Sequence, residues 1–142
     1  MSDAVSLLLV HMGARPCGIP CEHVVEIVPR VNLSQLPDAP AGVLGVINLR
    51  GRVVPVMDIR PRVAGAAAGT PPPYQHLVIV EAHGRQIGLA VDEVNDVLDV
   101  PRAAVERPGE LAGVHLPGVV RVRDDLVLVL GPDDFNPGHA GA

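Results

Sequence analysis

Between residues 45 and 60, two apolar runs flank a tight turn that carries Arg50 and Gly51. Residues 44–49 precede the turn and residues 53–59 follow it, and both runs are rich in Val, Ile and Leu. Gly51 can adopt the positive φ that such a turn often needs. We therefore expect a β-hairpin whose tip holds the Arg50 guanidinium in a fixed place. That arrangement suits a docking charge better than an enzyme pocket.

The same pattern recurs in the second half of the chain. With a shift of 73 residues, Gly45 and Arg50 align with Gly118 and Arg123. A shift of 70 residues brings the segments 18–21 and 24–28 onto 88–91 and 94–98. Any two valine-rich hairpins look alike, but here the glycine, acidic and arginine positions coincide as well as the apolar ones. We interpret this as an internally duplicated β unit.

Short apolar runs separated by turn residues extend along the whole chain, which predicts an all-β fold. We expect two sets of five strands, at residues 5–12, 16–21, 24–28, 44–49, 53–59, 77–82, 86–91, 94–100, 119–123 and 126–130. Residues 29–42 and 101–117 read as loops, 64–73 as a flexible linker and 136–142 as a tail. Turn signals at this spacing favour barrels, and the lack of a long amphipathic helix argues against a parallel α/β fold.

Length and composition exclude several classes of protein. A chain of 142 residues with 48% hydrophobic residues can form one domain around a sizeable core. The net charge of -5 and the presence of only two aromatic residues, Tyr74 and Phe135, argue against nucleic-acid binding. All eleven basic residues are Arg, so lysine-dependent chemistry is excluded. No apolar run approaches the ~20 residues of a membrane span, and the N-terminus lacks a basic region, so we expect a soluble cytoplasmic protein.

Two cysteines, Cys17 and Cys21, lie near His11 and His23. A zinc site is conceivable, but structural zinc sites usually show two closely spaced pairs of ligands. Both cysteines fall in a strand pattern, where a free thiol behaves as a small buried hydrophobic group. We favour this second interpretation and expect no metal.

No set of residues resembles a catalytic constellation or a cofactor site. There is no G-x-S-x-G motif and no phosphate-binding glycine loop. Asp92, Glu93 and Asp96 form a carboxylate cluster in sequence, but strand alternation predicts that they are solvated positions of a strand edge and turn. We expect a protein without catalysis or cofactor.

Five motifs in a fixed order carry a resemblance to a known family. They are V-E-I at 25–27, L-P-D-A-P at 36–40, G-V-I-N-L-R-G at 45–51, V-P-V-M-D-I-R at 54–60 and G-L-A-V-D-E-V at 88–94. The N-L-R-G and P-V-x-D elements after a Pro-rich loop are the most specific of these. From Leu8 to about Leu130, the chain resembles the CheW family, the adaptors of bacterial chemosensory arrays.

The resemblance implies two five-stranded SH3-like β-barrel subdomains packed around a shared hydrophobic core. The first subdomain would span residues 14–63, and the second would span 76–131 together with the N-terminal strand. The implied function is non-catalytic: coupling the cytoplasmic signalling domains of chemoreceptors, the methyl-accepting chemotaxis proteins, to the regulatory domain of a CheA-type histidine kinase. The implied location is the cytoplasm, at chemoreceptor arrays, with no direct membrane insertion.

The resemblance also implies which residues bind the receptor: Val25, Glu26, Ile27, Asn48, Arg50 and Gly51. Glu26 and Arg50 would pair with each other, and the second half of the chain would carry the kinase-facing surface, whose residues stay unassigned. Because residues 101–117 form a short loop for this family, the alternative is an accessory protein that binds receptors without engaging the kinase. A small β-barrel enzyme or ligand-binding protein is the other class considered.

Overall fold

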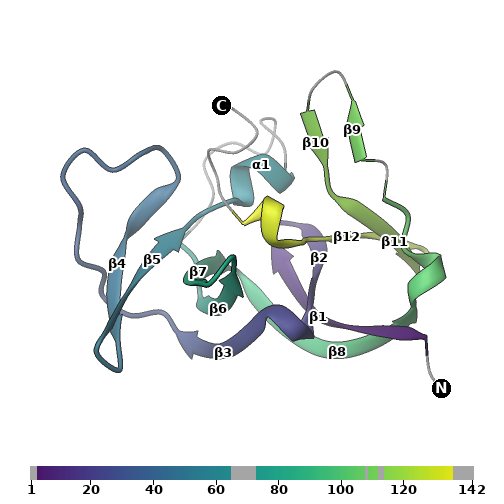
Figure 1. The fold of residues 1–142 in the computed structure, drawn as a ribbon, viewed down its shortest axis with the longest axis horizontal. Helices are drawn as coiled ribbons and strands as arrows, with labels where there is room; N and C mark the ends of the chain where they lie inside the picture. The colour runs from purple at the N-terminus through teal and green to yellow at the C-terminus, as the bar shows by residue number, and fades with distance from the viewer. Residues whose placement is uncertain (1–2, 65–72, 108, 112–113, 136–142) are drawn as a thin grey trace.

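The computed structural model describes residues 3–64, 73–107, 109–111 and 114–135, which form two five-stranded sheets and a short ribbon (Figure 1). The first sheet has the order β11-β12-β2-β1-β8. Its strands are β1 (Ala4–Met12), β2 (Arg15–Pro20), β8 (Glu93–Pro101), β11 (Gly118–Val122) and β12 (Asp125–Val129). The second sheet has the order β3-β6-β7-β5-β4. Its strands are β3 (Val24–Pro29), β4 (Val43–Leu49), β5 (Arg52–Met57), β6 (His76–Ala82) and β7 (Arg85–Val91). The predicted all-β class with two five-stranded units is confirmed.

The strand registers confirm the internal repeat. In the second sheet, β5 runs parallel to β7 with Val56 opposite Gly88, and in the first sheet β12 runs parallel to β2 with Val129 opposite Gly18. These two pairings are related by the shifts of 73 and 70 residues. The antiparallel pairs β3–β6 and β8–β1 also match, and each has a bulge at the equivalent place. Strands β1 to β5 therefore correspond to β6, β7, β8, β11 and β12.

The two sheets follow the predicted division of the chain only in part: β1, the N-terminal strand, joins strands of the second half as expected, whereas β2, β6 and β7 do not lie with the rest of their predicted ranges. The β1–β2 hairpin of the first repeat joins β8, β11 and β12 of the second, while β6–β7 joins β3, β4 and β5. The ranges 14–63 and 76–131 therefore each supply strands to both sheets. Sequence patterns could not reveal this exchange, because pairing between distant strands leaves no local signal.

Three apolar clusters lie among the described residues. One lies within the second sheet around Leu77 and Ile79, and another within the first around Leu7 and Val129. The largest cluster takes buried residues from both sheets. Its members are Leu8, Val10, Met12, Cys17, Ile19, Ile59, Val78, Val80, Ala82, Leu89, Val91, Leu130 and Phe135. Each sheet thus has its own core, and a shared core joins the two.

The connecting segments contain some regular structure. Residues 101–117, predicted to be a loop, include the short helical turn η3 (Arg102–Ala104) and the ribbon of β9 (Gly109–Leu111) and β10 (Val114–Leu116). Strands of three residues are too short to show an alternation pattern, so the sequence analysis missed them. Further turns are η1 (Cys21–His23) and η4 (Pro132–Asp134).

One short α-helix, α1 (Arg60–Ala64), precedes the predicted linker. Most of that linker, at 65–72, and the predicted tail at 136–142 lie outside the described residues. In the part of the chain that the structure describes, no helix is long and apolar enough to cross a membrane.

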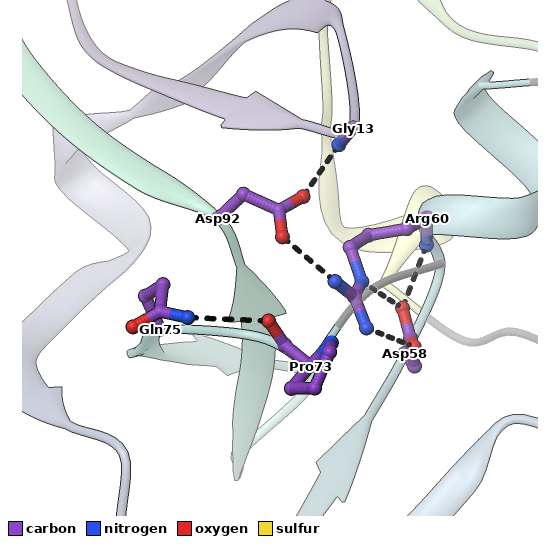
Figure 2. A network of polar contacts seen from close by, with 6 residues as sticks. All are labelled: Gly13, Asp58, Arg60, Pro73, Gln75 and Asp92. Carbon is purple, nitrogen blue, oxygen red and sulfur yellow. Dashed lines mark hydrogen bonds and ion pairs between the residues drawn. The ribbon is translucent and has the colours of Figure 1, made fainter. Parts of the chain in front are cut away.

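A buried polar network fastens the two sheets together at the start of α1 (Figure 2). The Arg60 guanidinium donates to Asp58 from Nε and Nη2 at 2.9 Å each, and from Nη1 to Asp92 at 2.8 Å. The second Asp92 oxygen accepts the Gly13 backbone N–H at 2.6 Å. The network thereby links the end of β5, the β7–β8 junction and the β1–β2 turn.

The Arg60 side chain is only 4% exposed, and its charge is compensated by two carboxylates. Burial by itself would lower the pKa of the Arg60 guanidinium, but its contacts with Asp58 and Asp92 raise that pKa above its ordinary value. Asp92, predicted to be solvated, is 18% exposed. The prediction was wrong because a distant arginine supplies the counter-charge that allows this carboxylate to leave water.

Candidate functional site

The β4–β5 hairpin ends in a two-residue turn, and its tip lies at one end of the molecule (Figure 1). Arg50 and Gly51 both have positive φ, 51° and 84°, which is the pattern of a type I′ turn. The Gly51 N–H donates to the Asn48 side-chain oxygen at 2.8 Å. Asn48 and Gly51 thus shape the turn, and the turn places the Arg50 side chain.

Arg50 reaches Glu26 on β3, which is the edge strand at the opposite side of the sheet from β4. The guanidinium makes a two-pronged contact: Nη2 donates to Oε2 at 3.0 Å, and Nη1 donates to Oε1. The hydrogen bond and the charge of Arg50 lower the pKa of Glu26. Reciprocally, the hydrogen bond from Glu26 and its charge raise the pKa of Arg50. Both groups are therefore charged at neutral pH.

This ion pair lies at the surface. The Arg50 side chain is 73% exposed and that of Glu26 is 23% exposed. Exposed ion pairs contribute little to folding stability. The pair is thus better placed for contact with another molecule than for holding the fold together.

A groove of about 230 Å³ surrounds the pair, lined by Val25, Glu26, Leu49, Arg50, Arg52 and Gln86. The structure therefore brings together three of the predicted site residues, Val25, Glu26 and Arg50. Asn48 and Gly51 support the turn beside it. Ile27 is 42% exposed and is not one of the lining residues.

Three lining residues, Leu49, Arg52 and Gln86, were not among the predicted site residues. Arg52 pairs with Leu49 across the turn, so its position near Arg50 could have been inferred from the hairpin. Gln86 lies on β7, which runs parallel to β5 and comes from the other repeat. No signal in the sequence places these two strands side by side.

The described cysteines and histidines form no ligand cluster. Cys17 is buried in the shared core, whereas Cys21 is partly exposed, and both thiols are free. Burial raises the pKa of Cys17 to about 12, and nearby Arg15 only partly offsets this. Among the described residues, no three His, Cys, Asp or Glu side chains gather so that they could hold a metal ion.

The fold and this surface define a small all-β protein with a fixed charge pair and apolar side chains exposed along one groove. A family model described as "CheW-like domain" matches residues 6–135. The chain therefore belongs to the CheW-like domain family, and the predicted family is confirmed. Its members are scaffold or adaptor proteins rather than enzymes, in agreement with the expected lack of catalysis.

Named relatives agree with this assignment. The chain is 42% identical over 138 residues to "Chemotaxis protein CheW" of Rhizobium meliloti, with 94% of this chain and 88% of the relative covered. It is 31% identical over 113 residues to "Protein FrzA" of Myxococcus xanthus, with coverage of 78% and 70%. A crystal structure of the scaffolding protein TtCheW from Thermoanaerobacter tengcongensis has the same fold. Its TM-score is 0.80 at 23% identity, covering 95% of this chain and 90% of that one.

Proposed function

We propose that this chain is a non-catalytic chemotaxis adaptor that couples chemoreceptors to a CheA-type histidine kinase. Its family and the relatives named for chemotaxis support the pathway. The similar structure described as a scaffolding protein supports the adaptor role. In this proposal the protein works in the cytoplasm, at chemoreceptor arrays, and touches no nucleic acid.

The exposed pair of Arg50 and Glu26 is the observation that carries the receptor-binding part of the proposal. A guanidinium has five N–H donors, and Glu26 accepts from two of them. The other three have no partner among the described residues. Glu26 thus holds the Arg50 guanidinium in one orientation, while the remaining N–H donors are available to acceptors on a receptor.

We assign the receptor contact to Arg50, Glu26 and Val25, which line one groove. Asn48 and Gly51 act through the turn that they shape. Ile27 was also expected in the contact, and its assignment stays a prediction because it does not line this groove.

An adaptor needs a second surface that is separate from the first. The first sheet and the β9–β10 ribbon lie toward the other end of the molecule from the β4–β5 tip (Figure 1). We propose that this end binds the regulatory domain of the kinase. The alternative hypothesis is an accessory protein that binds receptors but not the kinase. A binding experiment distinguishes the adaptor from this accessory protein.

The experiment titrates the purified protein with a receptor signalling fragment and, separately, with the kinase regulatory domain. Wild-type protein should bind both, and the three should form one complex. Arg50→Glu should weaken receptor binding by about tenfold or more and leave kinase binding unchanged, because interface energy concentrates in a few central residues. Arg123→Glu is the matched control for receptor binding, because Arg123 has the equivalent position in the other sheet. This variant should bind the receptor fragment as wild type does. Unchanged receptor affinity in Arg50→Glu would contradict the receptor site. No kinase complex above about 10 µM would favour the receptor-only reading.

A further inference from the structure

A larger groove adjoins the one around Arg50. It has a volume of about 620 Å³ and lies between β5 and the β6–β7 hairpin. Arg52 and Gln86 line both grooves, so the two share part of their walls. Apolar side chains, including Val53 and Ile87, form part of the wall, and Val53 is 72% exposed.

The charged side chains that line this groove are all basic. Arg52 and Arg85 line it together with His83, and no Asp or Glu is among its lining residues. Neither arginine has an ion-pair partner in the described part of the chain. The chain as a whole carries a net charge of -5, so this local excess of positive charge stands out.

Acidic side chains lie on the other side of the β6–β7 hairpin tip. Glu22 and Glu81 line a neighbouring hollow that shares His83 and Gly84 with the cationic groove. His83 itself contacts Asp133, with 3.6 Å between Nε2 and Oδ1. The hairpin tip therefore separates an acidic hollow from the groove with two uncompensated arginines.

The internal repeat supplies a comparison within the same molecule. Arg85 is the first residue after the β6–β7 turn, and Arg15 is the first residue after the β1–β2 turn. Both repeats therefore have an arginine at the position of Arg85. Arg52 corresponds to Asp125, because Leu49 pairs with Arg52 as Val122 pairs with Asp125. In the first sheet, position 125 therefore holds an acid where this groove has the base Arg52. Of these two equivalent pairs of positions, 52/85 and 125/15, the pair in the second sheet is the one with two arginines.

We propose that Arg52 and Arg85 select an acidic amphipathic segment of the partner that engages Arg50, which under the proposed function is the chemoreceptor signalling domain. The apolar wall would take the segment's apolar side chains, and the two arginines would pair with its carboxylates. This inference rests on the proposed function and extends its contact surface along β5 and β7. Arginines at the rim of such an interface govern association rate and salt dependence as well as affinity.

The test measures the affinity of the receptor signalling fragment for wild type, Arg52→Glu/Arg85→Glu, Arg50→Glu and the control Arg15→Glu. Arg15 is an exposed arginine at the equivalent turn of the other sheet. At about 50 mM salt, the double variant should bind about tenfold or more weakly, with a smaller deficit at about 500 mM, because salt screens exposed charges. Arg15→Glu should bind as wild type does.

The outcomes separate this inference from the proposed function. If Arg50→Glu loses binding while the double variant binds as tightly as wild type at both salt concentrations, the inference is wrong and the proposed function stands. If wild type binds no receptor fragment, both are wrong. A deficit in the double variant that does not change with salt would also contradict charge selection. Reversing single acidic residues of the fragment to Arg should restore binding to the double variant if the pairing is direct.

Discussion

Arg50 and Arg123 occupy equivalent positions in the two sheets, each directly after the first strand of a hairpin and each with positive φ, 51° and 56°. Such a backbone is uncommon for a residue other than Gly, Asn or Asp. Only Arg50 has a carboxylate partner among the described residues; Asp96, which corresponds to Glu26, is exposed and makes no bond to Arg123 there. The duplication thus kept the hairpin, whereas the ion pair is found in one copy.

Neutralising this ion pair should separate binding from folding. We expect Glu26→Gln and Arg50→Gln to change the midpoint of thermal unfolding by only about 2 °C, because the pair is exposed. Receptor binding should nevertheless fall in both. Circular dichroism measures the midpoint of unfolding, and titration with the receptor fragment measures the loss of binding. A large drop in the unfolding midpoint would instead make the pair a structural element.

Removing the buried guanidinium should destabilise the protein strongly. Arg60→Met leaves Asp58 and Asp92 without their counter-charge in a buried setting, which costs about 3–5 kcal/mol in unfolding free energy. Urea denaturation measures this loss. Arg52→Met, a change at an exposed arginine, is the control and should cost less than about 0.5 kcal/mol. Equal stability of the two variants would show that the network does not tie the sheets together.

The two thiols should differ in reactivity. Cys17 is fully buried and its pKa is raised to about 12, so it should resist alkylation at pH 8, whereas the partly exposed Cys21 should react. Cys17→Val should cost about 1 kcal/mol or less, since the residues are similar in size. Mass spectrometry of the alkylated protein counts the labelled thiols before and after unfolding. Stoichiometric zinc in the purified protein, lost with either cysteine, would overturn the reading of both as free thiols.

Stability should decline at alkaline pH, in part through Cys17. The pKa of the thiol is 9.0 when exposed and about 12 in the fold. Between these values the unfolded chain loses the proton while the folded protein keeps it, so the free energy of unfolding falls as pH rises. Below pH 9 both states hold the proton and this effect is absent. Cys17→Val should therefore show a shallower decline than wild type when urea denaturation is repeated from pH 8 to 10.5.

Much of the fold could be predicted because its signals are local. The β4–β5 hairpin follows from two apolar runs and the Arg50–Gly51 turn, and the repeat follows from the recurrence of that pattern. Glu26, Arg50 and Val25 were named from motifs and do lie on one groove. The β9–β10 ribbon escaped prediction because its strands are too short for a periodic signal.

The sequence alone determined the strands, the turns and the duplicated unit, since side-chain alternation and turn chemistry act between neighbouring residues. Only the tertiary structure decided that each sheet takes a hairpin from the other repeat. That exchange brings Gln86 beside Arg52 and places Asp92 against Arg60. Both contacts join segments far apart in the chain, and their energies come from burial and charge compensation that exist only after the sheets have assembled.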